Sequence, residues 1–267
     1  MTAFHVMSGA GEAFQRPLVQ KISVADVFDA LLLGLDDFRE KPSHYVFLCL
    51  MYPVAGIVLF AWSSGANMLP LVFPMMSGFA LLGPIAAIGL YEISRRRELG
   101  LDTSWQHALE VRHSPAMPAI VAVGVVLFIL FIAWLLAAQA IYVHYFGDVA
   151  PLSIGGFLTQ VLTTPAGHAM MVWGDVTGFV FAALVLAMTV VAFPMLLDRD
   201  CGAVSAIDTS IRATVANPVP VAIWGLIVAL LLILGMLPFF AGLAVVLPIL
   251  GHSTWHLYRK LVAPQRQ

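Results

Sequence analysis

The sequence predicts an all-α integral membrane protein with six transmembrane helices. Of its 267 residues, 61% are hydrophobic and only 10% are charged, and the mean hydropathy is +0.94. In soluble domains, about 45–50% of the residues are apolar and about 25% are charged. This composition excludes a water-soluble enzyme and the disordered, collagen-like and disulfide-rich secreted classes. A formal net charge of −2 offers no basic surface for nucleic acid.

Apolar runs of membrane-crossing length support this prediction. About 20 apolar residues in a helix cross a hydrocarbon core of about 30 Å. The chain contains six runs of about that length: 44–62, 69–94, 117–142, 175–197, 219–237 and 239–258. A tight turn near Gly235 to Pro238 separates the last two. We therefore divide the chain into a tail, residues 1–22, and one membrane domain, residues 23–267.

The positions of Lys and Arg predict the orientation. They occur before the first run, between the second and third, between the fourth and fifth, and after the sixth. The connections after the first, third and fifth runs carry none. Because cytoplasmic loops are enriched in Lys and Arg, both termini are expected in the cytoplasm.

Three polar segments between the runs are predicted to form amphipathic helices, at 23–40, 102–113 and 203–216. In the first, apolar residues recur at helical spacing, with Ser23 as a candidate N-cap. The predicted apolar face contains Val24, Val27, Phe28, Leu31, Leu32 and Leu35. Asp26, Asp29, Asp36 and Asp37 fall mostly on the opposite side. We interpret these segments as elbow helices at the membrane surface; partner-binding or regulatory surfaces are the alternative.

The second and sixth runs resemble each other and predict an internal parallel repeat. An offset of 164 residues matches Gly78 with Gly242, Ala80 with Ala244, Pro84 with Pro248 and Ile85 with Ile249. Both copies would have the same orientation, unlike the inverted repeats of many transporters. Chance convergence of short apolar motifs is the alternative explanation.

Asp175 is the deepest ionisable residue by hydropathy, and it allows two interpretations. It could be a proton or cation site near the non-cytoplasmic face, because charged groups at membrane depth are usually functional. It could also be the N-cap of the fourth span. We favour the cap because residues 175–197 already form a full span, which leaves 153–163 and 165–173 as an interfacial helix pair.

His252 and His256 lie four residues apart on the sixth run and are the only candidates for a cofactor site. This spacing puts both side chains on one helix face, where they could bind a metal or one could ligate haem. No carboxylate or thiol with matching spacing lies nearby in the sequence, so we expect neither group. Trp255 and Arg259 instead indicate an interface belt at the cytoplasmic surface.

A second group at the end of the second run is assigned the same interfacial role. It contains Tyr91, Glu92 and Arg95. Glu92 and Arg96 are spaced to form an i, i+4 ion pair, and the arginines are expected to anchor the helix at the positive side of the membrane.

Three stretches resemble an uncharacterised family of bacterial integral membrane proteins, a domain of unknown function. They are G-P-I-A-A-I-G-L-Y-E-I-S-R-R (83–96), F-P-M-L-L-D-R-D (193–200) and V-L-P-I-L-G-H-S-T-W-H-L-Y-R (246–259). The resemblance implies a location in the bacterial inner membrane. Some members carry the label of cytochrome c oxidase subunits, but this chain has too few spans and histidines for the catalytic subunit.

The sequence contains no metalloprotease, serine hydrolase, phosphate-binding-loop or dinucleotide-binding signature. We therefore expect no enzyme and no cofactor.

The first function hypothesis is a non-catalytic accessory or assembly component of a larger membrane complex, of which a respiratory complex is one example. A transporter or channel for a small solute is the alternative. The expected partners are the lipid bilayer and other subunits of such a complex.

Overall fold

The computed structural model describes residues 17–40, 56, 69–104, 106–107, 111–148, 151, 153–199, 201–238 and 241–264. Within these ranges the regular elements are helices, accompanied by one isolated bridge between Val19 and Val262. The expected all-α class is thus confirmed for the described residues. The first predicted run, 44–62, lies outside them except for Gly56.

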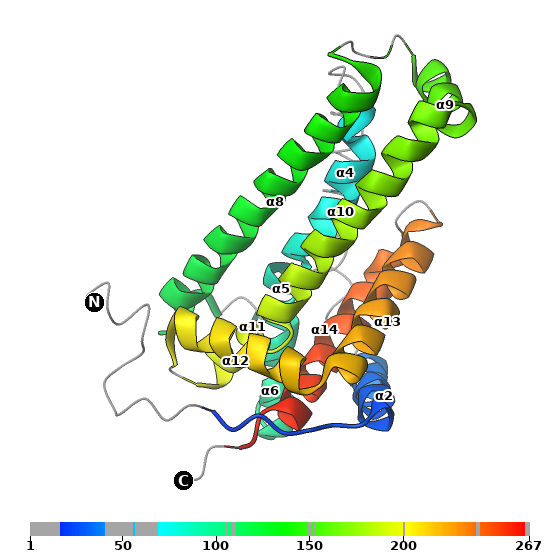
Figure 1. Cartoon of the computed structure of the whole chain (residues 1–267). Coiled ribbons are helices and arrows are strands. Elements are labelled where there is room, and N and C mark those ends of the chain that lie inside the picture. Colours follow the sequence, from blue (N-terminus) through cyan, green and yellow to red (C-terminus); the bar gives the residue numbers. More distant parts are fainter. Residues whose placement is uncertain are drawn as a thin grey trace. The chain divides into compact units, whose positions relative to one another are not determined.

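Figure 1 shows the helices of the described residues in their order along the chain. Their bounds are α2 (Val24–Glu40), α4 (Leu69–Phe79), η1 (Ala80–Leu82), α5 (Gly83–Ala86), α6 (Ile88–Glu98), η2 (Val111–His113), α8 (Met117–Phe146), α9 (Ile154–Thr163), α10 (Pro165–Thr189), α11 (Ala192–Asp198), α12 (Gly202–Ala216), α13 (Pro218–Met236) and α14 (Leu243–Leu261). Of the segment 102–113, the described residues show helix at 106–107 and in η2.

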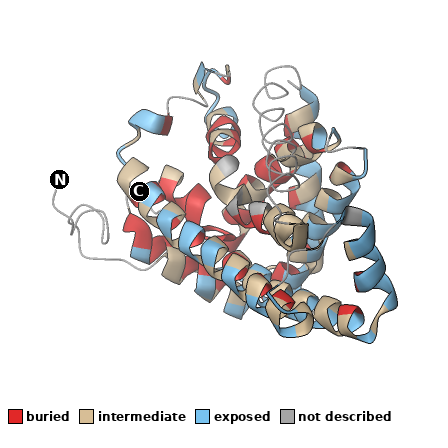
Figure 2. Cartoon of the chain, turned by 90° about the horizontal axis from the view of Figure 1, so that it is seen from above, coloured by how far each residue is buried: buried red, intermediate tan, exposed pale blue. Residues whose placement is uncertain are grey.

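Among the described residues, three stretches are long and apolar enough to cross a membrane: Met117–Phe146, Pro165–Asp198 and Pro218–Met236. At about 1.5 Å per residue, each is long enough for a hydrocarbon core of about 30 Å. Many of their side chains are exposed, as the pale blue positions along the helices show (Figure 2). Such apolar exposure is expected of helices that face lipid or other membrane helices.

The second and sixth predicted runs do not form uninterrupted apolar helices. Residues 69–94 are divided among α4, η1, α5 and α6, in a stretch that contains Pro74 and Pro84. The sixth begins at Leu243 rather than at residue 239, and the second half of α14 is polar, ending with Arg259 and Lys260. Six spans are therefore not established by these helices.

The chain forms two compact units. The second unit comprises residues 54–83 and 126–185 and is centred on Trp134. The Trp134 indole donates a hydrogen bond to the Pro74 carbonyl over 2.8 Å, and its ring lies 5.8 Å from that of Phe181. Gly78 lets α4 approach α8, because a Cβ at this position would lie 2.7 Å from the Trp134 ring.

The N-terminal cap of α10 corrects the interpretation of Asp175. Thr164 Oγ1 accepts a hydrogen bond from the Gly167 amide over 3.0 Å, and Pro165 occupies the first helical position. This cap starts the helix ten residues before Asp175, which is exposed within α10. Asp175 is therefore not an N-cap. The predicted interfacial helix at 165–173 is instead continuous with the rest of α10.

The first unit comprises residues 1–53, 84–125 and 186–267, and contains α2, α6, α11, α12, α13 and α14. Helix α2 begins with a reciprocal cap in which Ser23 and Asp26 each accept a hydrogen bond from the other's backbone amide. It runs beside α14 (Figure 1). Gly34 makes this approach possible, because a Cβ on it would overlap the backbone of Ser253.

The buried face of α2 differs from the predicted one. It consists of Val27, Ala30, Gly34 and Asp37. Phe28 and Leu32, which belong to the predicted apolar face, are 49% and 59% exposed. Small side chains permit the close contact with α14, whereas larger apolar side chains remain outside the protein interior. The predicted apolar face of α2 and the face that contacts the protein interior are therefore largely different surfaces, which share Val27.

Candidate functional site

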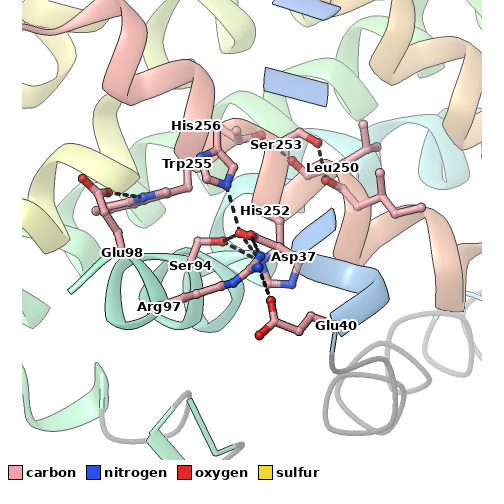
Figure 3. Close-up of polar contacts among 12 residues, drawn as sticks. Asp37, Glu40, Ser94, Arg97, Glu98, Leu250, His252, Ser253, Trp255 and His256 are labelled. Carbon is pink, nitrogen blue, oxygen red and sulfur yellow. Dashed lines mark hydrogen bonds and ion pairs between the residues drawn. The ribbon is translucent and has the colours of Figure 1, made fainter. Parts of the chain in front are cut away.

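A buried polar network connects three helices of the first unit and is centred on Asp37, in the last turn of α2. Asp37 is 6% exposed. Its Oδ2 lies 2.7 Å from Ser94 Oγ on α6 and 2.9 Å from His256 Nε2 on α14 (Figure 3). The other histidine of α14 completes the arrangement: His252 Nδ1 lies 2.6 Å from Ser94 Oγ and 3.8 Å from Asp37 Oδ2.

Arg97, one turn beyond Ser94 on α6, joins the same network. Its guanidinium is bound to Asp37 through Oδ1 and to Glu40 through Oε2. Asp37 therefore binds Ser94 and His256 with one oxygen and Arg97 with the other. Glu40 is 54% exposed and forms the solvent-facing edge of the network.

The partners of Asp37 determine its ionisation. Burial by itself raises the pKa of Asp37, but the hydrogen bonds with His256 and Ser94 and the charges of the two histidines lower it. The net pKa lies below the ordinary value of 3.8. Asp37 is therefore a carboxylate at neutral pH.

The side chains of the network are increasingly buried from His256 to His252. The His256 side chain is 20% exposed, whereas those of Asp37 and His252 are 6% and 0% exposed. A continuous series of hydrogen-bonding groups thus leads from a partly exposed imidazole to a fully buried one. His256, at the partly exposed end, is the imidazole that solvent can reach.

A second polar cluster joins α14 to two other helices of the first unit. The Trp255 indole donates to Glu98 over 3.0 Å, and Arg259 lies 2.7 Å from the other oxygen of Glu98. Tyr258 donates its hydroxyl proton to Asp198 over 2.6 Å. These contacts join α14 to α6 and α11.

The residues assigned to an interface belt occupy mostly buried positions. Tyr91 and Trp255 are 3% and 1% exposed, so their rings pack inside the first unit rather than facing outward. Glu92 is also buried, and it pairs with Arg95 at 3.2 Å and with Arg96 at 3.8 Å. The expected i, i+4 contact is therefore present.

The histidine pair has a carboxylate neighbour that lies far away in the sequence. Asp37 lies 219 positions before His256 in the chain, so spacing within one helix could not reveal it. Among the described residues, no group of three or more His, Cys, Asp or Glu side chains is placed to hold a metal ion.

Sequence reasoning missed Asp37, Ser94 and Arg97 as site residues. Asp37 was assigned to the polar face of its helix, and Ser94 appeared unremarkable between apolar and basic residues. One signal was available: Asp37 continues the i, i+3, i+7 series of Val27, Ala30 and Gly34. A carboxylate on a face of small residues indicates a buried, paired acid.

Helices of this length and apolarity define an integral membrane protein. Residues 72–198 match a family model described as predicted integral membrane protein (DUF2189). The resemblance to an uncharacterised membrane protein family is thereby confirmed over this segment. No curated protein and no solved structure matches the chain.

Proposed function

We propose that the chain is a non-catalytic accessory or assembly component of a larger membrane complex in the bacterial inner membrane. The observation that carries the proposal is the contrast between its apolar helices and its charged groups. The sequences of α8 and α13 contain no Asp, Glu, Lys or Arg, and α10 contains only Asp175. A pathway for ions would need more polar groups at membrane depth.

The exposed surfaces of these helices support the same proposal. Leu226, Leu230 and Ile233 follow one another at helical spacing on α13 and are 54–68% exposed. Leu136 on α8 is 66% exposed. These surfaces suit lipid and the helices of partner subunits.

We further propose the six-span topology with elbow helices and both termini in the cytoplasm. Every Lys and Arg of the sequence falls within the residue ranges of the first unit, and the ranges of the second contain none. This segregation is what the preference of Lys and Arg for the cytoplasmic side predicts.

The parallel repeat remains part of this proposal. Tyr91 and Trp255 are equivalent in the repeat, and both are buried. Arg95 and Arg259, also equivalent, each pair with a glutamate. The backbones differ, because α14 is continuous through Pro248 whereas the equivalent stretch is interrupted between residues 80 and 87.

Purification of the tagged full-length chain from its native membrane in mild detergent tests the proposed function. Co-purifying chains are identified by mass spectrometry, and the visible spectrum of the same sample is recorded. An untagged culture processed in parallel provides the control. We expect stoichiometric partners that are absent from the control. A preparation that contains only this chain would contradict the accessory role and favour transport assays.

A further inference from the structure

We propose that the outward face of α2 is a docking surface for a basic amphipathic segment of a partner subunit. The inference rests on the proposed accessory function and deepens it, because it states where a partner binds and what chemistry that partner has. It is based on the exposed apolar side chains of α2, on the charges that border them, and on the contrast with α12.

The outward face of α2 contains large apolar side chains that the first unit leaves uncovered. On its inward face, α2 buries Val27, small residues and Asp37, and it packs mainly on α14 (Figure 1). Phe28 and Leu32 lie one helical turn apart on the outward face and are 49% and 59% exposed. Leu33 is 39% exposed. Apolar side chains on adjacent turns form the stripe through which one amphipathic helix binds another.

Exposed carboxylates border this apolar stripe. Asp29, Asp36 and Glu40 follow one another at helical spacing along one side of Phe28 and Leu32. Their side chains are 56%, 62% and 54% exposed. A partner that covers the apolar stripe therefore meets a row of negative charges along its edge.

The basic neighbours of α2 compensate only part of this charge. Two basic side chains are each shared by two acids of the helix: Lys260 by Asp26 and Asp29, and Arg97 by Asp37 and Glu40. Asp36 lies 3.7 Å from Arg39, and both of these side chains are more than 60% exposed. With neutral histidines, the ion pairs of α2 thus leave two negative charges uncompensated, and protonation of His256 would still leave one.

This excess of negative charge favours a basic protein segment over lipid as the occupant. Helices that bind lipid surfaces are rich in Lys and Arg, which anionic lipids of the cytoplasmic leaflet attract. Arg39 is the one basic residue in the sequence of α2. A segment that packs apolar side chains on Phe28 and Leu32 and places Lys or Arg beside Asp36 is complementary to the surface in both respects.

Helix α12 provides a matched comparison. It also buries small residues and exposes apolar ones, among which Val215 is 74% exposed. The charged residues in its sequence are Asp208 and Arg212, which pair with each other at 3.0 Å. The outward face of α12 therefore carries no excess charge and suits lipid.

The test is photo-crosslinking of the full-length tagged chain in its native membrane. The probe, p-benzoylphenylalanine, replaces Leu32 or, as the control, Val215. Both side chains are exposed, so the probe lies outside the protein interior at either position. We expect one discrete protein adduct from position 32 and only lipid adducts from position 215. The crosslinked segment, mapped by mass spectrometry, should contain more Lys and Arg than Asp and Glu and should have apolar residues at helical spacing.

A second substitution tests the role of charge. In the chain with the probe at position 32, Asp36→Lys should lower the yield of the protein adduct by about threefold or more, because it replaces an attraction by a repulsion. Asp36→Glu keeps the charge and should keep the yield. Equal yields in these two variants would refute the charge complementarity.

Three other results at position 32 would overturn the proposal: lipid adducts alone, an adduct with a second copy or another part of this chain, or an adduct with a segment that has no excess of basic residues. Co-purification of partners with the native sequence separates this outcome from failure of the proposed function. Stoichiometric partners without an adduct at position 32 would refute the docking surface and leave the accessory role intact. The absence of both partners and adduct would contradict both.

Discussion

Asp37 Oδ2 lies 2.9 Å from His256 Nε2, although 219 positions separate the two residues in the chain. This contact joins the amphipathic helix α2 to α14. Together with Ser94 and Arg97, it also ties both helices to α6. The stability of this part of the first unit should therefore depend on Asp37 more than on any exposed acid of α2.

Asp37→Asn should destabilise the protein by about 2 kcal/mol, because it leaves Arg97 and the histidines without their buried carboxylate partner. Denaturation in detergent micelles, followed by circular dichroism, measures the effect. Asp36→Asn is the control: Asp36 is 62% exposed in its contact with Arg39 and should matter by less than about 0.5 kcal/mol. Equal effects of both variants would contradict the burial of Asp37.

The contribution of Asp37 should also depend on pH. Because its pKa in the folded protein is below 3.8, the ionised form stabilises the fold, and this stabilisation is complete above the ordinary pKa. It is lost as the pH falls through the lowered pKa. The difference in stability between the native sequence and Asp37→Asn should therefore be constant near neutral pH and shrink below about pH 4. Denaturation at a series of pH values measures it. A constant difference down to about pH 2 would contradict the assigned pKa direction.

Gly34→Ala should cost about 1 to 3 kcal/mol, because its Cβ would overlap the backbone of Ser253 and push α2 away from α14. Gly174→Ala is the matched control, because Gly174 also lies in a helix and nothing lies within 4 Å of the Cβ position. That variant should be neutral or slightly stabilising. Thermal unfolding of both variants in the same detergent makes the comparison. Equal melting temperatures would show that α2 is not packed closely on α14.

Thr164→Ala should destabilise the start of α10 by about 1 kcal/mol, the usual contribution of an N-cap side chain. Hydrogen exchange at the Gly167 amide, which the Thr164 hydroxyl binds, should accelerate in this variant. Unchanged exchange would show that the cap is not formed.

Asp175→Asn should leave both stability and biological function unchanged, because Asp175 is exposed within α10 and caps no helix. Growth of a strain that carries this variant, compared with a deletion strain, measures the effect. A proton-coupled carrier that used Asp175 would lose activity instead. A deletion-like phenotype would therefore favour the transport alternative over the accessory role.

Some features of the fold could be predicted from the sequence because they depend on composition and local signals. The length and apolarity of α8 and α13 are visible in the sequence, and Ser23 correctly indicated the start of α2. The start of α10 was missed, because Asp175 appeared to be a cap while the Thr164-Pro165 signal was not weighed. The helix begins at the capping residue upstream of the apolar run and not at the polar residue inside it.

The network around Asp37 could not be predicted because its members come from three distant segments. The histidine spacing was visible, but its carboxylate partner lies near the other end of the chain. The face of α2 that contacts α14 could not be predicted from hydrophobicity, because in a membrane protein large apolar side chains can face lipid while small ones form the helix contact. The small residues Ala30 and Gly34 therefore indicate the face that contacts α14, whereas the large apolar residues Phe28 and Leu32 do not.

The most direct test of the central contact is a double-mutant cycle with Asp37→Asn and His256→Ala, measured by reversible denaturation in detergent. If the two side chains interact as the structure shows, their coupling energy should be about 1 to 3 kcal/mol. The parallel cycle with Asp36→Asn should be additive within about 0.5 kcal/mol. Additivity in the Asp37 cycle would contradict the contact, and with it the polar network that links α2, α6 and α14.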